Sequence, residues 1–517
     1  MINNSRRLEN SVKNLSNAMI SQGISLILNF LVRTVFVIYL NEEYLGTNGL
    51  FSNILSILSL AELGFGTAMV YNMYKPLVNN DQRKIKALMK LYAKVYTIIG
   101  IIVAIIGIGL MPFLDYIIKD TSGIENLKFI YLIFLIDCVC SYFFAYKRSI
   151  LTADQKEYIC SQYKYIFTIV KSVLQIITLV IFKNFILYLL IQILFTLLEN
   201  IFISIKVNNI YPFLKEKNNE KLSKNELMLI KNDVKALVLT KLGHVMLTGT
   251  DNIIISTFIG IGVVGILSNY NLIINSVVMV ISQIMTSLTG SIGNYIASNN
   301  KRNNELLFKR VEFVNFWIYS FCMICLIFLL NPFIKLWIGE KYILNQVNVI
   351  VLSINFLISG IMSTLWTFRS TIGLFTQGKY RPIFAAILNI VISVILAKSI
   401  GVVGVLLGTI ISRLLVNLWY DPYIIYKFGF DKSVKSYYLR NIFRISLVMF
   451  MIFFINYIQV FILCNNILIK FFILIFLCIS IPTIIFLIVY RNTDEFKYLK
   501  GIINNITKKI TKKLILN

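Results

Sequence analysis

The chain has 517 residues, of which 57% are hydrophobic and only 14% are charged, with a formal net charge of +26 and a mean hydropathy of +0.77. Soluble domains carry about 25% charged residues, and a soluble fold has no core large enough to hide this much apolar surface. The composition therefore excludes an ordinary soluble protein and predicts an all-α integral membrane protein.

Apolar windows of the length needed to cross about 30 Å of hydrocarbon follow one another along the chain. Six of them precede a polar stretch at 207–235, and eight follow it. We therefore expect about fourteen transmembrane helices, at 15–40, 45–72, 93–113, 127–147, 160–182, 185–206, 236–259, 263–292, 311–332, 343–368, 381–400, 402–426, 441–462 and 467–490.

The basic residues predict the orientation of these helices. If the N-terminus is cytosolic, most of the 50 Lys and Arg residues fall in cytosolic segments and few fall in outer loops. Because Lys and Arg resist translocation, both termini are expected on the cytosolic side of the membrane. A basic cytosolic rim attracts anionic lipid headgroups, so the high net charge does not require nucleic acid as a partner.

The sequence also contains an internal duplication. Gly46-x-x-Gly49 corresponds to Gly262-x-x-Gly265 at an offset of 216, and Arg148 corresponds to Arg369 at an offset of 221. The matches are colinear, so helices 1–6 and 7–12 are expected to form two six-helix bundles related by a pseudo-two-fold axis, with two appended helices. The expected domains are 1–206 (first bundle), 207–235 (cytosolic linker), 236–426 (second bundle), 427–490 (appended helices) and 491–517 (basic cytosolic tail).

Several ionisable residues fall within the predicted spans, and Arg369 lies at the inner end of the span 343–368. Each costs about 2.5–3.5 kcal/mol at the bilayer centre on insertion scales, so it usually faces a cavity or a partner. Because Arg and Lys suit phosphate, the cations are candidates for binding an anionic substrate. The acids either pair with these cations or bind a coupling ion. The candidate cations are Arg33, Lys171, Arg369 and Arg413, and the candidate acids are Glu62, Asp137 and Asp251.

Catalytic chemistry has little support in the sequence. With a single histidine in the chain, a multi-His metal site or a second catalytic histidine is excluded. The segment GLFTQGK at 373–379 has the glycine and lysine spacing of a P-loop, but Tyr380 replaces the Ser or Thr that would hold magnesium. We therefore expect no metal, no cofactor and no enzymatic activity.

Three segments resemble bacterial polysaccharide flippases of the Wzx type, which belong to the multidrug/oligosaccharidyl-lipid/polysaccharide (MOP) exporter superfamily. They are LNEEYLGTNGLFSNILSILSLAELGFGTAMVYNMYKPL (40–77), TGTDNIIISTFIGIGVVGILSNYNLI (248–273) and SIGNYIA (291–297). The resemblance implies an alternating-access transporter that moves undecaprenyl-diphosphate-linked oligosaccharide repeat units to the outer leaflet for capsule, O-antigen or exopolysaccharide synthesis. It also implies membrane lipid, a polysaccharide polymerase and glycosyltransferases as partners.

Two alternatives remain at this stage. One is a cation-coupled small-molecule exporter of the same superfamily, with Asp251 or Glu62 carrying the ion. The other is a membrane glycan polymerase or ligase, which the short outer loops disfavour.

Overall fold

The computed structural model describes residues 2–59, 65–118, 124–216, short stretches between 222 and 234, 249–298, 301–374, 377–378, 380–462 and 466–501. Within these ranges the secondary structure is entirely helical, which confirms the predicted all-α class. Twelve of the described helices are long and apolar enough to cross a membrane. The other two predicted spans, 45–72 and 236–259, are described only in part, so the total of fourteen is not confirmed.

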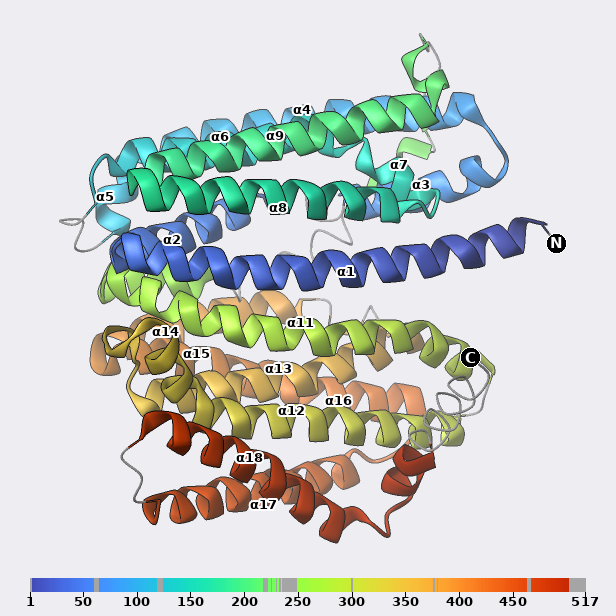
Figure 1. Cartoon of the computed structure of the whole chain (residues 1–517). Coiled ribbons are helices and arrows are strands. Elements are labelled where there is room, and N and C mark those ends of the chain that lie inside the picture. Colours follow the sequence, from blue (N-terminus) through green and yellow to red (C-terminus); the bar gives the residue numbers. More distant parts are fainter. Residues whose placement is uncertain are drawn as a thin grey trace, which may run out of the picture. The chain divides into compact units, whose positions relative to one another are not determined.

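The chain divides into two compact units, residues 1–268 and 269–517. Figure 1 shows long helices that run back and forth within each unit. In the first unit, α1 packs on α8, α8 on α9, and α6 on both α4 and α9. Its elements are α1 (Ile2–Tyr39), α2 (Glu42–Leu58), α3 (Phe65–Val78), α4 (Gln82–Leu110), η2 (Met111–Phe113), α5 (Leu114–Ile117), α6 (Leu127–Ala145), α7 (Arg148–Ala153), α8 (Glu157–Phe182), α9 (Phe185–Ile210) and η3 (Pro212–Lys215), followed by helical residues 249–258 and the first turns of α11 (Ile261–Ser298).

In the second unit, α12 packs against α13 and α18, and α14 packs against α15. Helix α12 is the most enclosed, because 61% of its apolar window is buried against 22% for α18. The remaining surface of α18 is apolar, as expected for a helix that meets lipid. The elements are the rest of α11, α12 (Lys301–Ile338), η4 (Glu340–Tyr342), α13 (Gln346–Ile372), α14 (Arg381–Ile400), α15 (Val402–Arg413), η5 (Leu414–Leu418), α16 (Tyr420–Ile424), η6 (Ile425–Phe430), α17 (Lys435–Val460) and α18 (Ile467–Tyr490).

The turns between helices follow local sequence signals. Lys183 ends α8 in the left-handed conformation, and the side chain of Asn184 then accepts a hydrogen bond from the Leu187 amide at 3.0 Å to begin α9. Gly401, with φ of 62° and ψ of −135°, joins α14 to α15 in a positive-φ conformation that favours glycine. These tight turns keep consecutive helices antiparallel and adjacent.

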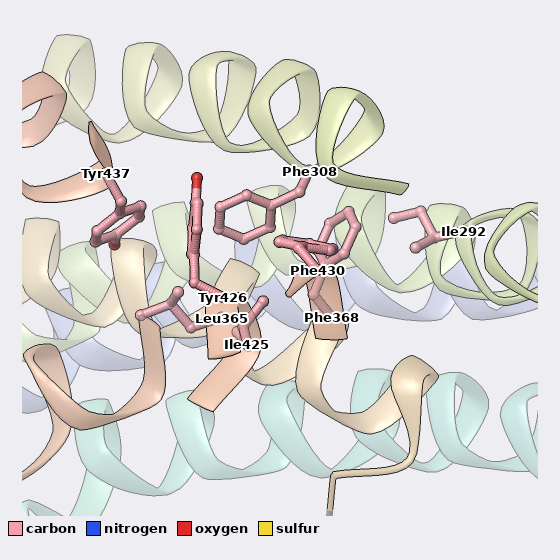
Figure 2. Packing of buried hydrophobic residues seen from close by; sticks show 8 residues of the cluster. All are labelled: Ile292, Phe308, Leu365, Phe368, Ile425, Tyr426, Phe430 and Tyr437. Atoms are coloured by element: carbon pink, nitrogen blue, oxygen red, sulfur yellow. The ribbon is translucent and has the colours of Figure 1, made fainter. Parts of the chain in front are cut away.

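A buried aromatic cluster organises one end of the second unit (Figure 2). Phe308 of α12 packs edge-on against Phe368 of α13 at 5.0 Å between ring centroids, and against Tyr426 at 5.9 Å. Edge-to-face ring pairs add about 0.5–1.5 kcal/mol beyond their area burial. The cluster thus fixes the end of α13, which carries Arg369.

Candidate functional site

Arg33 lies on α1 and reaches the first turns of α11. Its Nη1 atom donates a hydrogen bond to Ser268 Oγ at 2.9 Å, and its side chain is partly buried. Ser268 is a neutral partner, and no described carboxylate forms an ion pair with Arg33. The positive charge of this guanidinium therefore stays uncompensated among the described residues.

Two glycines bring α2 and α11 close to each other near this contact. A Cβ atom on Gly46 would lie 2.0 Å from the Ile261 carbonyl oxygen, and one on Gly265 would lie 2.2 Å from the Glu42 carbonyl oxygen. The two backbones therefore approach as only glycine permits. Gly46 and Gly265 belong to the two duplicated motifs. The first turns of α11, which carry Gly265, lie in the first unit and not in the second.

Lys171 lies at mid-length of α8, within electrostatic range of two carboxylates. These are Asp137 on α6 and Glu199 on α9. Asp137 Oδ2 accepts a hydrogen bond from Gln192 Nε2 at 3.0 Å, while its Oδ1 atom is buried and has no partner among the described residues. Glu199 forms an ion pair with Arg148 at 2.8 Å. The structure thus brings Lys171 and Asp137 into one polar network inside the first unit.

Arg413 ends α15 where the helix widens into the π-helical turn η5. Its Nη1 atom donates to Ser359 Oγ at 2.8 Å and to the Asn355 carbonyl at 3.4 Å, both on α13. π-Helical turns inside α-helices often occur at functional sites. Arg413 is therefore held on α13 by a hydroxyl and a carbonyl, much as Arg33 is held by a hydroxyl.

Arg369 has a different environment from the other candidate cations. Its side chain is buried, and Nη1 lies 3.0 Å from Asp421 Oδ1. The Nε atom donates to the Leu374 carbonyl at 2.8 Å, and Nη2 donates to the Gln377 carbonyl. Arg381 also pairs with Asp421. Arg369 thus ties α13, α16 and the 373–380 turn together, and this turn is the segment that has P-loop spacing.

The remaining candidate acids differ in how much the structure describes. Asp251 lies in helical residues 249–258, has a buried Oδ1 atom and makes a further interaction. Glu62 lies outside the described residues.

A second buried ionic cluster was not predicted from the sequence. Glu312 of α12 pairs with Arg444 of α17 at 3.0 Å and accepts a hydrogen bond from Asn441 at 2.8 Å. Arg440 lies 3.7 Å from the other oxygen of Glu312. The signal was available, because Arg440 and Arg444 are four residues apart and share one helix face. The predicted span 441–462 leaves Arg440 in the preceding loop and puts Arg444 at the edge of the span, whereas α17 begins at Lys435.

The described residues contain no group of three or more His, Cys, Asp or Glu side chains placed to hold a metal ion. No protein-family model matches the sequence, and no curated protein matches it.

The fold nevertheless has solved counterparts. The lipid II flippase MurJ in an inward closed conformation matches with a TM-score of 0.62 and 17% identity over 92% of this chain and 98% of that chain. A multidrug-resistance MATE transporter of the MOP superfamily, inward-facing, matches with a TM-score of 0.60 and 15% identity over 79% of this chain and 98% of that chain. The Vibrio cholerae MATE transporter VcmN matches with a TM-score of 0.55 and 15% identity over 83% and 100%. The chain therefore has the two-bundle fold of MOP-superfamily transporters.

Proposed function

We propose that this protein moves undecaprenyl-diphosphate-linked oligosaccharide repeat units across the bacterial cytoplasmic membrane. In this account a cationic cavity within the membrane opens alternately to each side. The cargo is a lipid diphosphate with a sugar headgroup, and the protein acts as a transporter and not as an enzyme. A polymerase and glycosyltransferases would act on the same repeat units before or after translocation.

The observation that carries this proposal is the contrast between cations that pair with a carboxylate and cations inside the spans that do not. Arg148, Arg369 and Arg444 are each neutralised by a carboxylate within 3.0 Å. Arg33 instead contacts a serine hydroxyl, and Lys171 has its carboxylates at longer range. An uncompensated charge in a low-dielectric setting is costly, so it favours an anionic ligand that supplies the missing partner.

The diphosphate suits these side chains chemically. A guanidinium binds phosphate oxygens through a forked pair of hydrogen bonds, whereas an ammonium acts as a point charge. Arg33 and Arg413 would grip the diphosphate by replacing their serine contacts, and Lys171 would add attraction. Arg369 remains a candidate on sequence grounds, but its present hydrogen bonds suit it better to holding the 373–380 turn.

Alternating access has support from the related folds. The matched MATE family transporters of the MOP superfamily include an inward-facing and an outward-facing structure. A fold that supports both openings meets the mechanical requirement for carrying a headgroup across the bilayer.

Energy coupling would involve the acids. Asp137 is the best placed of the three because it lies within electrostatic range of Lys171 and its Oδ1 atom is buried. Lys171 nearby would compete for this carboxylate. Binding of a proton or sodium ion at Asp137 would therefore release Lys171 toward the cargo. Asp251 and Glu62 are the further coupling candidates.

A second candidate function is cation-coupled export of a small molecule, favoured by the MATE-like fold together with the buried carboxylate of Asp137. The uncompensated Arg33 argues against a cationic cargo.

The test is leaflet exchange in vesicles that contain the purified protein. A fluorescent undecaprenyl-diphosphate oligosaccharide is expected to exchange between leaflets, and the corresponding uncharged polyprenyl glycoside is not. Transport of a cationic drug in place of the diphosphate cargo would establish the exporter and overturn the flippase.

A further inference from the structure

A pocket of about 540 Å³ lies at one end of the first unit, where α4 begins and α6 and α9 end. This end is predicted to be cytosolic. The lining contributes four ammonium groups but only one carboxylate. The charged lining residues are Lys86, Lys90, Lys147, Lys215 and Glu216.

The wall that carries Lys215 and Glu216 is held in place by Tyr211. The Tyr211 hydroxyl donates to Asp154 Oδ2 at 2.6 Å, and Lys156 Nζ lies 3.4 Å from the same hydroxyl. Pro212 then starts the short helix η3, which packs against α4. These contacts direct the end of η3 to the pocket, so the four lysines come together through folded structure and not through a flexible loop.

The one carboxylate is already engaged. Glu216 pairs with Lys86 at 2.5 Å, and the Lys86 side chain is only 12% exposed. Lys147 donates to the Asn208 side-chain oxygen at 3.1 Å, which is a neutral acceptor. Burial lowers the pKa of Lys147, and repulsion from Lys215 lowers it further. Lys147 and Lys215 are therefore neighbouring like charges.

We propose that this pocket binds a phosphate-bearing anion. Ammonium groups act as point charges toward phosphate oxygens, and the Tyr146 hydroxyl and the Asn208 amide in the lining add hydrogen-bond donors. Its volume falls within the range of about 300–1,000 Å³ that is usual for small-ligand sites. An anion between Lys147 and Lys215 would turn their repulsion into two attractive contacts.

The site is separate from Arg33 and Lys171 and goes beyond the proposed function, because it does not depend on the identity of the cargo. Two sources share the required chemistry. One is the headgroup of an anionic phospholipid in the adjacent leaflet, and the other is a water-soluble phosphate or diphosphate.

The test is a titration of inorganic pyrophosphate into the full-length protein in phosphatidylcholine nanodiscs, followed by calorimetry. Each charge-assisted hydrogen bond is worth about 1.5–3 kcal/mol, or roughly tenfold in affinity. The double variant Lys147→Gln/Lys215→Gln is therefore expected to bind at least about tenfold more weakly. Lys84→Gln is the matched control, because Lys84 lies on the same end of α4 but pairs with Glu226 at 2.5 Å.

The proposal fails if the protein does not bind pyrophosphate, or if the double variant and the Lys84 variant bind it equally well. If the double variant shows no cooperative thermal unfolding by circular dichroism, Lys147→Arg is measured in its place. This variant retains the charge and is expected to retain binding. Repeating the titration in phosphatidylglycerol nanodiscs distinguishes the sources. Competition identifies the lipid headgroup, and unchanged affinity identifies a soluble phosphate.

Discussion

Arg369 Nη1 lies 3.0 Å from Asp421 Oδ1. In the first unit, Arg148 Nη2 lies 2.7 Å from Asn200 Oδ1. Both members of the second-unit pair follow those of the first-unit pair by 221 positions, the offset at which the sequence repeats. The duplication therefore extends to a contact between distant residues, and each unit ties the end of one helix to another in the same way.

The Asp421 pair should be essential for the stability of the second unit. Removing one partner of a buried ion pair typically costs about 3–5 kcal/mol because the other charge stays buried. Asp421→Ala leaves both Arg369 and Arg381 without their carboxylate, so we expect a large loss of thermal stability in detergent. Asp431→Asn is the control, because its ion pair with Lys301 is mostly exposed, such pairs contribute about 0–1 kcal/mol, and asparagine tolerates the left-handed backbone at this position. Equal melting temperatures for the two variants would contradict this role.

The glycine contact between α2 and α11 predicts a steric effect. Gly46→Leu and Gly265→Leu force side-chain atoms into backbone carbonyls, and overpacking of this kind costs about 1–3 kcal/mol or more. We expect both variants to give less monodisperse protein on size-exclusion chromatography. Gly109→Leu should behave like the unmodified protein, because a Cβ at that position meets nothing within 4 Å. If Gly46→Leu is tolerated as well as Gly109→Leu, the two backbones do not approach as closely as described.

The Glu312 cluster predicts that one carboxylate holds α17 on α12. Glu312→Gln removes the carboxylate that pairs with Arg440 and Arg444, so α17 and its neighbour α18 should detach more often. Cys478 on α18 is fully buried and reports this event. In a background where Cys478 is the only cysteine, we expect faster labelling by a membrane-permeant maleimide. Glu340→Gln, which removes an exposed carboxylate, should leave the rate unchanged.

Anion binding in the lysine pocket should weaken at alkaline pH. The pKa of Lys147 is lowered from its ordinary value of 10.5, so its charge is present at lower pH and is lost before that of an ordinary lysine as pH rises. The other facing groups are Lys86, Lys90, Lys215, Glu216 and Tyr146. Sulfate is the suitable probe, because its charge is constant over this range.

For this reason, as pH rises, the sulfate affinity of the unmodified protein is expected to decrease before pH 10.5 is reached. Lys147→Arg keeps its charge throughout and should shift the fall to higher pH. Identical pH profiles would show that Lys147 does not contribute to binding.

Much of the helical arrangement could be predicted, because an apolar stretch long enough to cross the bilayer indicates where a transmembrane helix lies. The windows 127–147, 381–400 and 467–490 agree closely with α6 (Leu127–Ala145), α14 (Arg381–Ile400) and α18 (Ile467–Tyr490). The window 311–332 falls well short of α12, because hydropathy does not record that a helix continues through polar residues outside the membrane.

The partners of the buried charges were harder to predict. Arg369 and Asp421 are 52 residues apart, and only packing of α13 against α16 brings them together. The sequence carried a usable signal, since Asn200 and Asp421 occupy equivalent positions in the two repeats. Hydropathy alone likewise did not separate Arg33, which contacts a hydroxyl, from Arg444, which contacts a carboxylate.

The central claim is that the cations inside the spans that form no ion pair with a described carboxylate carry the diphosphate of the cargo. Its most direct measurement is the rate of leaflet exchange of a labelled undecaprenyl-diphosphate oligosaccharide by the double variant Arg33→Gln/Lys171→Gln. Lys128→Gln serves as the control, because Lys128 forms an exposed ion pair with Asp115. The account predicts at least about a tenfold loss for the double variant, from two charge-assisted contacts, and no change for the control. Exchange at the unmodified rate in a correctly folded double variant would contradict it.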